Sequence, residues 1–276
     1  MCATCGCDGD GDATTITAPG PGHEHTPDHV HGHVHDHVHT HDDDHTHDHD
    51  HDHDHEGHVH TETVTLEQKV LAKNDELAEQ NRRWFAERGI LALNLTSSPG
   101  AGKTTLLERT IRDLSHDRPV AVIEGDQETL LDAERIRAAG ARAIQVNTGA
   151  GCHLDATMVR RALDALNPES DSTLFIENVG NLVCPALFDL GERSKVVVIS
   201  VTEGDDKPLK YPHMFAAAGL VIVNKIDLLP YVSFDLDKCR DDLRSLNPDA
   251  DVLPMSALSG EGSSRWYEWV ANRANA

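Results

Sequence analysis

Residues 97–104 read Ser97-Ser98-Pro99-Gly100-Ala101-Gly102-Lys103-Thr104. An apolar run, 90–95, precedes them and an amphipathic stretch, 104–114, follows. A strand, a glycine-rich turn and a helix in this order predict a phosphate-binding loop, because glycines let backbone N–H groups approach phosphates and the helix N-terminus favours anions. The alternative is a chance Gly-Lys-Thr turn at a helix start, which would not require the strand before it.

The loop positions have predicted roles. We expect the ammonium of Lys103 to reach the β- and γ-phosphates and the hydroxyl of Thr104 to bind Mg²⁺. The motif departs from the usual pattern at Ser97, where glycine is common. The predicted phosphate contacts are Gly100, Ala101, Gly102, Lys103, Thr104 and Thr105.

Outward from the loop, short apolar runs alternate with helical stretches. The runs cover 90–95, 120–123, 143–146, 174–176, 196–201 and 220–223. The helical stretches cover 104–114, 128–138, 155–166, 234–246 and 264–273. Strands that are apolar on both faces, with helices between them, indicate a mostly parallel sheet covered on both sides. With right-handed crossovers, this predicts an α/β fold with a doubly wound sheet.

A second motif, Asn224-Lys225-Ile226-Asp227, follows the run at 220–223. A carboxylate at a strand end accepts hydrogen bonds from N1–H and the exocyclic amino group of guanine, and adenine offers neither donor in that arrangement. Four residues alone are a weak signal, but their position downstream of a phosphate loop strengthens it. The predicted base contacts are Asn224, Lys225 and Asp227, together with Ser256 and Ala257 in the loop after a strand-like pair at 252–253.

Two acids at or just beyond strand ends complete the predicted catalytic set. Asp126 and Glu177 would hold Mg²⁺ directly or through water, and Gly180 would offer its N–H to the γ-phosphate. The alternatives are a helix N-cap for Asp126 and a surface acid for Glu177. The predicted catalytic residues are therefore Lys103, Thr104, Asp126 and Glu177. No arginine finger is identifiable, which predicts slow intrinsic turnover.

The first 62 residues differ from the rest. Residues 1–60 hold 14 of the 47 Asp and Glu, 17 of the 20 His and no Lys or Arg. So few apolar side chains cannot offset the entropy of ordering, which predicts a disordered tail over 1–62. A GTPase domain over 63–276 is then expected to begin with an amphipathic helix that ends near Gly89. Its apolar residues are Leu66, Val70, Leu71, Leu77 and Trp84.

Three groups of residues could bind metal. Cys2, Cys5 and Cys7 form a CxxCxC cluster, whose thiolates with a backbone or terminal nitrogen would suit square-planar Ni(II). Cys152, His153 and Cys184 would suit Zn²⁺ or Ni²⁺, with buried structural thiols as an equal alternative. The 17 histidines between 23 and 60, interleaved with Asp, would form a looser store. The alternatives are an oxidation-prone N-terminus for the first group and a purification tag or inert spacer for the last.

Composition bears on partners and compartment. The formal net charge of −23 makes nucleic acid an unfavourable partner, since phosphate backbones require clustered Lys and Arg. No apolar run reaches the roughly 18 residues of a membrane span, and the N-terminus lacks the features of a secretory signal. Six Cys suit a reducing compartment, so we expect a cytoplasmic protein.

The strings MCATCGC, SSPGAGKTT, GAGCHLDA, FIENVGNLVCPA and NKID, in this order, resemble the HypB family of nickel-insertion GTPases for [NiFe] hydrogenase maturation. The match covers 64–276 and the extreme N-terminus. The resemblance implies a dimerising phosphate-loop GTPase that hydrolyses GTP to GDP and phosphate, and Ser97 looks usual for the family. It also implies a high-affinity nickel site at Cys2, Cys5 and Cys7. A Zn²⁺ or Ni²⁺ site at Cys152, His153 and Cys184 would lie at a nucleotide-linked homodimer interface.

The implied partners are a HypA-type metallochaperone and the precursor of the hydrogenase large subunit. The leading hypothesis is a GTP-gated chaperone that stores nickel and delivers it. One alternative is the related urease accessory GTPase, which also carries His-rich tails but is not expected to start with CxxCxC. The other is a nickel storage protein whose G domain is not catalytic.

Overall fold

The computed structural model describes residues 15–17, 56–126, 131–149 and 151–275, with side chains described from residue 68 onward. The predicted nickel cluster at Cys2, Cys5 and Cys7 lies outside the described residues. So do most of the histidine tract and the first residues of the helix expected at 128–138. The chain divides into two units, 19–68 and the remainder, and the second contains the features described below apart from the first residues of α1.

The centre of the second unit is one sheet in the order β1-β4-β3-β5-β2-β6-β7-β8. Strands β2 to β8 are all parallel, and β1 pairs antiparallel with β4 at the edge. The predicted α/β fold with a doubly wound, mostly parallel sheet is confirmed. The strands are β1 (Thr15–Thr17), β2 (Leu91–Ser97), β3 (Val120–Asp126), β4 (Arg142–Asn147), β5 (Thr173–Glu177), β6 (Ser194–Ser200), β7 (Leu220–Asn224) and β8 (Asp251–Pro254).

Several strands run further than their apolar cores suggest. β3 continues to Asp126, which sequence placed in a loop, and β5 ends on Glu177. The backbone ladder between them pairs Glu124 with Glu177, because parallel hydrogen bonding does not depend on an apolar side chain. As a result, carboxylates at 124 and 177 are neighbours at the carboxyl edge of the sheet.

Helices follow most strands, as expected. The longer ones are α1 (Glu56–Glu87), α2 (Lys103–Leu114), α3 (Leu131–Ala138), α4 (Ala156–Leu166), α8 (Leu236–Leu246) and α9 (Ser263–Ala274). Predicted starts at 155 and 234 were slightly early, because the side chains of Asp155 and Asp235 cap α4 and α8 from outside the helix. The short elements α5 (Cys184–Leu187), α6 (Lys207–Lys210), α7 (Pro212–Ala216) and the 3-10 helix η1 (Ile226–Tyr231) were not predicted.

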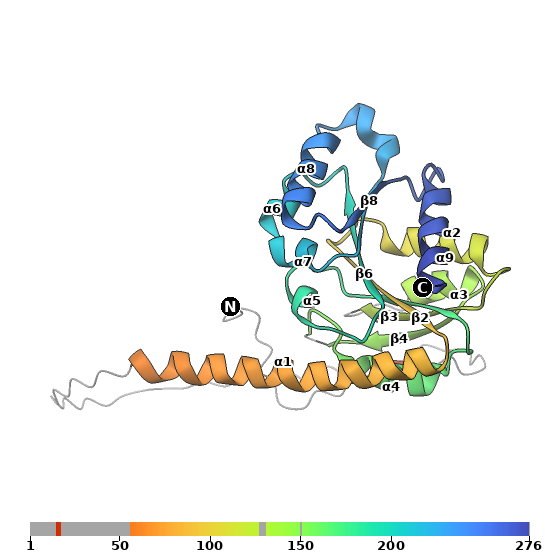
Figure 1. The fold of residues 1–276 in the computed structure, drawn as a ribbon. Coiled ribbons are helices and arrows are strands. Elements are labelled where there is room, and N and C mark those ends of the chain that lie inside the picture. The colour runs from red at the N-terminus through yellow and green to blue at the C-terminus, as the bar shows by residue number, and fades with distance from the viewer. Residues whose placement is uncertain (1–14, 18–55, 127–130, 150, 276) are drawn as a thin grey trace, which may run out of the picture. The chain divides into compact units, whose positions relative to one another are not determined.

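The two faces of the sheet are covered by different helices (Figure 1). On one face, α2, α3 and α9 enclose a core around Trp266, which is fully buried and donates its indole N–H to Thr110 at 2.9 Å. On the other face, α4 packs with Phe85 of α1, and α7 and α8 cover β6 and β7. The loops at the carboxyl ends of the strands therefore lie between two packed layers, where ligands of such sheets bind.

The buried face of α1 differs from the prediction. Among the side chains of α1 from residue 68 onward, the buried ones are Asn74, Ala78, Asn81 and Phe85, at helical spacing, whereas Val70 is 49% exposed. Of the apolar residues predicted for this helix, Leu71, Leu77 and Trp84 are half-buried, and Trp84 packs against the core. The side chain of Leu66 lies outside the described residues. Asn74 and Asn81 are more deeply buried than these residues because their amides have partners on distant loops. The helix also begins at Glu56, before the expected residue 63.

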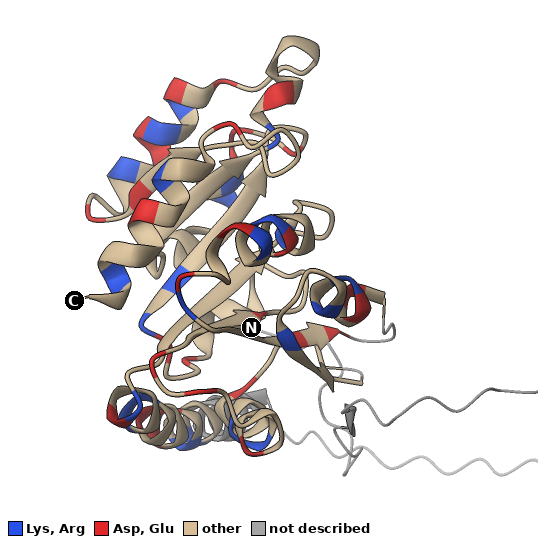
Figure 2. Cartoon of the chain, turned by 90° about the vertical axis from the view of Figure 1, so that its right-hand side faces the viewer, with Lys and Arg blue, Asp and Glu red and all other residues tan. Residues whose placement is uncertain are grey.

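Most of the described charged residues lie on the outer helices and few lie on the sheet between them. Lys and Arg lie beside Asp and Glu along the helices, and the central strands carry few charges (Figure 2). Of the described helices, none is long and apolar enough to cross a membrane.

Candidate nucleotide and metal sites

A cavity of about 530 Å³ lies at the carboxyl edge of the sheet. It is lined by the loop between β2 and α2, the end of β3, two residues of α3, the segment after β5, and Lys225. The predicted residues Gly100, Gly102, Lys103, Thr104 and Thr105 all line it, as do Asp126, Glu177 and Gly180. Ala101 is 1% exposed and packs in the core beneath the loop. The structure thus brings the predicted phosphate and catalytic residues around one space.

The loop conformation requires its glycines. Gly100 and Gly102 have φ values of 75° and 100°, where a side chain would be strained. A Cβ on Gly102 would also lie 2.6 Å from Nδ2 of Asn224. The ammonium of Lys103 donates to Oγ of Ser97 at 2.7 Å, and burial lowers the pKa of Lys103. Serine at position 97 therefore supplies an acceptor that glycine could not.

The oxygens around Thr104 form a hard donor set. The hydroxyl of Thr104 donates to Oε1 of Glu177 at 2.9 Å, and Oε2 of Glu177 is buried without a hydrogen bond. Burial raises the pKa of Glu177, an effect that the charge of Lys103 opposes. Glu177 is 5% exposed, so it is not a surface acid. A buried carboxylate oxygen beside a hydroxyl fits an oxygen-seeking cation such as Mg²⁺.

Glu124 belongs to the same set and was missed from sequence. Alternate residues of a strand share a face, so Glu124 and Asp126 point to the same side of β3, next to Glu177 of β5. Oε2 of Glu124 is also buried without a hydrogen bond. Burial raises the pKa of Glu124 to about 8, with further contributions from Glu177 and Asp126. Glu124 pairs directly with Glu177 across β3 and β5, and no motif along the chain marks it as part of this set.

The raised pKa makes stability depend on pH. Between its ordinary value of 4.5 and about 8, the carboxyl is ionised in the unfolded chain but protonated in the folded one, so its contribution to stability falls as pH rises through this window. Glu124→Gln should stabilise the nucleotide-free, EDTA-treated protein at pH 7 by about 2 kcal/mol, and by less than half of that at pH 5. Urea unfolding at both values measures this. Glu268→Gln, at an exposed position, is the control and should give no difference; an equal gain at both pH values for Glu124→Gln would contradict the prediction.

The Asn224–Asp227 motif lies against the phosphate loop. Asn224 donates to the carbonyl of Ala101 at 2.8 Å and accepts from the amide of Ala257 at 2.9 Å. Lys225 donates from Nζ to the carbonyl of Gly100 at 2.7 Å. These bonds join the three predicted nucleotide loops into one unit.

The loop that carries Ser256 and Ala257 is held by Arg109 of α2. Its guanidinium donates to the carbonyls of Ala257 and Leu258, each at 2.7 Å. Oδ1 of Asp227 is buried without a hydrogen bond. Buried polar atoms usually have a partner, so this oxygen is a candidate acceptor for a nucleobase. An acceptor oxygen at this position fits the N1–H and exocyclic amino donors of guanine.

Cys152, His153 and Cys184 come together although they follow different strands. Sγ of Cys152 lies 2.9 Å from Sγ of Cys184 and 3.7 Å from Nδ1 of His153. The three ligand atoms lie within 4.8 Å of one another, close enough to share one ion. Burial lowers the pKa of His153, which favours the neutral imidazole that binds metals. Two sulfurs and one nitrogen suit Zn²⁺ or Ni²⁺, with a further ligand from elsewhere.

One segment, 177–184, joins the two sites. At its start Glu177 bonds to Thr104, and a Cβ on Gly180 would lie 3.2 Å from three atoms of Pro99 in the phosphate loop. At its end, Nδ2 of Asn181 donates to the carbonyl of Cys152 at 3.3 Å, and Cys184 begins α5. Only six residues therefore lie between Glu177, a predicted Mg²⁺ contact, and Cys184, a predicted metal thiol.

Two asparagines of α1 contact the segment that follows Cys152 and His153 and the segment that follows Cys184. Asn74 accepts from the amide of Ala156 at 2.9 Å and donates to the carbonyl of Asp189 at 2.8 Å. Asn81 donates to the carbonyls of Ala156 and Leu190, at 3.0 and 3.2 Å. Each amide thus bridges the segment after Cys152-His153 to the segment after Cys184.

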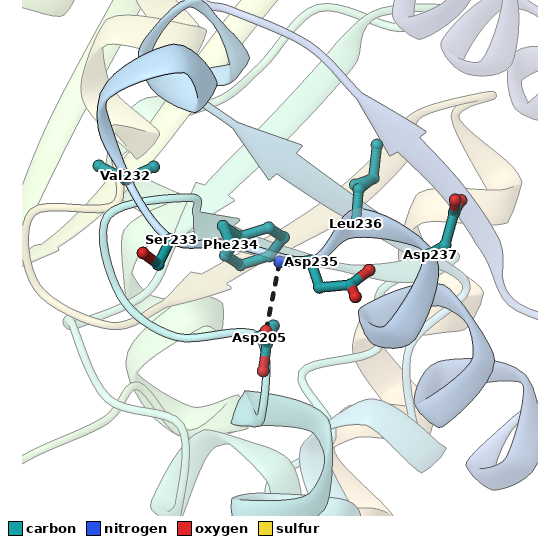
Figure 3. Close-up of a pocket in the computed structure, with 7 residues that line it drawn as sticks. All are labelled: Asp205, Val232, Ser233, Phe234, Asp235, Leu236 and Asp237. Carbon is teal, nitrogen blue, oxygen red and sulfur yellow. Dashed lines mark hydrogen bonds between the residues drawn. The ribbon is translucent and has the colours of Figure 1, made fainter.

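A second, more open cavity contains none of the predicted residues. It lies at the start of α8, where three aspartates gather with Phe234 and neighbouring side chains (Figure 3). Asp205 already pairs with Nζ of Lys238 at 2.8 Å and accepts from the amide of Asp235 at 3.2 Å. Asp235 caps α8, so these carboxylates serve the local structure.

Comparison with known proteins agrees with this geometry. Residues 91–254 match the family model "CobW/HypB/UreG, nucleotide-binding domain". "Hydrogenase maturation factor HypB" of Escherichia coli (strain K12) is 60% identical over 205 residues, covering 74% of this chain and 71% of the relative. The crystal structures of HypB from Archaeoglobus fulgidus and of HypB from Helicobacter pylori in complex with nickel each superpose with a TM-score of 0.69 and 39% identity. Each covers 74% of this chain, and 99% and 95% of the respective structure.

Proposed function

Because the chain belongs to the HypB family of hydrogenase maturation factors, which are nickel-binding GTPases, we propose that GTP hydrolysis controls how firmly it holds nickel at Cys152, His153 and Cys184. The observation that carries the proposal is the segment 177–184, which contacts the phosphate loop at one end and carries a metal thiol at the other. In this function the nickel is cargo, delivered to the hydrogenase large-subunit precursor.

The residues of the cavity have distinct tasks in hydrolysis. Lys103 leaves its bond to Ser97 and neutralises the charge that develops on the β,γ-bridging oxygen while water attacks the γ-phosphate. Mg²⁺, held by Thr104 with help from Glu177, Asp126 and Glu124, would supply further positive charge at the phosphates. The N–H of Gly180 would contact the γ-phosphate, so loss of that group would release the segment 177–184.

Binding of Mg²⁺ would require the bond between Thr104 and Glu177 to break or bend, since both oxygens would turn to the cation. The peptide of Asn178 follows directly, and its side chain accepts from the amide of Leu154, next to His153, at 3.0 Å. Nucleotide state would therefore bias the spacing of the three ligands. By linkage, nickel must then change nucleotide affinity by the same factor.

The remaining parts of the proposal concern storage and partners. Cys2, Cys5 and Cys7 would hold nickel tightly and the histidine tract would hold it loosely. Zn²⁺ would compete for the Cys152 site, whose ligands suit both ions. A nucleotide-linked homodimer would supply further ligands there, and a HypA-type metallochaperone would exchange nickel with it.

The test is Ni²⁺ affinity of the full chain carrying Cys2→Ser, Cys5→Ser and Cys7→Ser, measured by thiolate charge-transfer absorption. The affinities with GDP and with a non-hydrolysable GTP analogue should differ about 5- to 150-fold, the usual range of coupling between sites. Equal affinities in the two states would remove the gating function. Loss of urease but not hydrogenase activity in a deletion strain would instead favour the urease alternative.

Base specificity gives a separate prediction. Asp227→Asn replaces one acceptor oxygen by a donor, so it should weaken GTP binding by more than a hundredfold, on the order of 3 kcal/mol, since hydrogen bonds to a charged group contribute about 1.5–3 kcal/mol each. It should improve binding of xanthosine triphosphate, whose C2 carbonyl accepts from the new amide. Fluorescent nucleotide titration measures both. Asp237→Asn, on the exposed start of α8, is the control, and retained GTP preference in Asp227→Asn would contradict the assignment.

A further inference from the structure

A chain of buried polar groups runs beneath the Cys152, His153 and Cys184 cluster, on the face of the sheet that α4 covers. It begins at the amide of Leu154, which donates to Oδ1 of Asn178 at 3.0 Å. Nδ2 of Asn178 donates to Oδ1 of Asn94 at 3.4 Å, and Nδ2 of Asn94 donates to Oε1 of Glu192 at 3.0 Å. Asn94 and Asn178 are 0% and 1% exposed, so these bonds are shielded from water.

The chain continues to the other ligand segment. Glu192 lies 3.9 Å from Nζ of Lys195, and their side chains are 6% and 7% exposed. Nζ of Lys195 then donates to the carbonyl of Pro185 at 2.7 Å. Pro185 follows Cys184 directly, just as Leu154 follows His153. The groups thus form a continuous connection from one ligand segment to the other through the interior of the protein.

The sheet register explains why the groups meet. Asn94 of β2 pairs with Lys195 of β6 and, on its other side, with Ile176 of β5. Paired residues on neighbouring strands direct their side chains to the same face. Asn178 leaves β5 two residues after Ile176 and so returns to that face.

A role in stability alone explains this arrangement poorly. Taking both Lys195 and Glu192 out of water is costly, and well-packed apolar residues of similar size are often as stable or better. The ammonium of Lys195 also donates to the backbone carbonyl of Pro185. An apolar side chain could not make this bond and so could not hold that peptide in one position. What the pair supplies is a defined location for the peptide that follows Cys184.

We propose that Lys195 is a positioning residue for the metal cluster: through Pro185 it fixes where the thiol of Cys184 lies, and through Glu192, Asn94 and Asn178 it fixes the loop of His153 relative to it. The inference rests on the proposed metal site. Groups that orient metal ligands from outside their first layer change metal affinity by roughly 10- to 100-fold when they are removed.

The experiment uses the full chain with Cys2→Ser, Cys5→Ser and Cys7→Ser, titrated with Co²⁺ without nucleotide. Thiolate-to-cobalt absorption reports affinity, and the visible ligand-field bands report geometry. Lys195→Met should lower Co²⁺ affinity about tenfold and change the visible bands, while GTP hydrolysis without Co²⁺ stays at the parent rate. Unchanged affinity and bands would overturn the proposal.

Two further variants separate positioning from folding. The double variant Lys195→Met, Glu192→Gln removes both charges, avoids an unpaired buried carboxylate, and should recover stability in urea while Co²⁺ affinity stays low. Recovery of affinity together with stability would overturn the proposal. Thr110→Val, which removes a buried hydrogen bond on the opposite face, should lose stability with no change in Co²⁺ affinity.

The outcome is distinguishable from failure of the proposed function. If Cys184→Ala also leaves Co²⁺ affinity unchanged, the metal site itself is wrong. If Cys184→Ala abolishes binding and Lys195→Met does not alter it, only the role of Lys195 is wrong.

Discussion

Lys103→Ala should reduce GTP hydrolysis by about 10²–10³-fold, the usual cost of removing one donor from a site that stabilises developing negative charge. Lys103 lines the cavity, and its partner Ser97 carries no charge that could replace the lost ammonium. Because intrinsic turnover is expected to be slow, the variant should fall below detection in a phosphate-release assay. Maturation of hydrogenase in cells should be lost with it.

The substitution removes a buried side chain, so its controls matter. Lys103→Met keeps most of the aliphatic packing and should be as inactive as Lys103→Ala. Lys210→Ala changes an exposed lysine that pairs with Asp206 at the surface, and its activity should equal that of the parent protein. Maturation that survives Lys103→Ala would favour nickel storage as the main function and a G domain without a catalytic role.

Cys184→Ala should weaken Ni²⁺ binding at the Cys152 site by more than the roughly 100-fold upper range of changes made outside the first layer of ligands. The variant leaves one thiol and one imidazole, too few to compete with water and buffer for an ion that prefers several S and N ligands. Titration in the background lacking the N-terminal cysteines should show loss of thiolate charge-transfer absorption. GTP hydrolysis without metal should be retained.

Cys239→Ala is the matched control, because it makes the same chemical change at another buried cysteine. Cys239 is fully buried in α8, and burial raises its pKa to about 12, so it remains a thiol rather than a metal-binding thiolate. The variant should lose about 1 kcal/mol of stability and bind Ni²⁺ as tightly as the parent. Equal losses of affinity in both cysteine variants would indicate a general effect on folding.

The parts of the fold that sequence predicts are those encoded locally. The phosphate loop is a run of eight residues whose glycines are needed for their φ values, and the apolar strands identify themselves by length and flanking helices. Asp227 was likewise visible as part of a four-residue motif. In each case the neighbours along the chain carry the information.

The parts that were missed depend on distant partners. Asn74 and Asn81 look like surface residues of α1, and their burial follows from carbonyl and amide groups at 156, 189 and 190. Glu124 looked like an ordinary strand residue until β3 and β5 paired and placed it beside Glu177. Buried polar residues of this kind depart from the apolar pattern of a core. Rules based on sequence patterns are expected to fail at such positions, which occur near functional sites.

Glu177 and Asn178 are adjacent, so a single peptide connects the predicted nucleotide site to the predicted metal site. Consecutive side chains of an extended backbone point in opposite directions, so Glu177 lines the predicted nucleotide cavity while Asn178 accepts from the amide of Leu154, next to His153. A shift of this peptide moves both residues at once, without a long helix or a hinge to carry it. If the proposed coupling runs through this peptide, a single residue inserted between the two positions should reduce the effect of the bound nucleotide on nickel affinity.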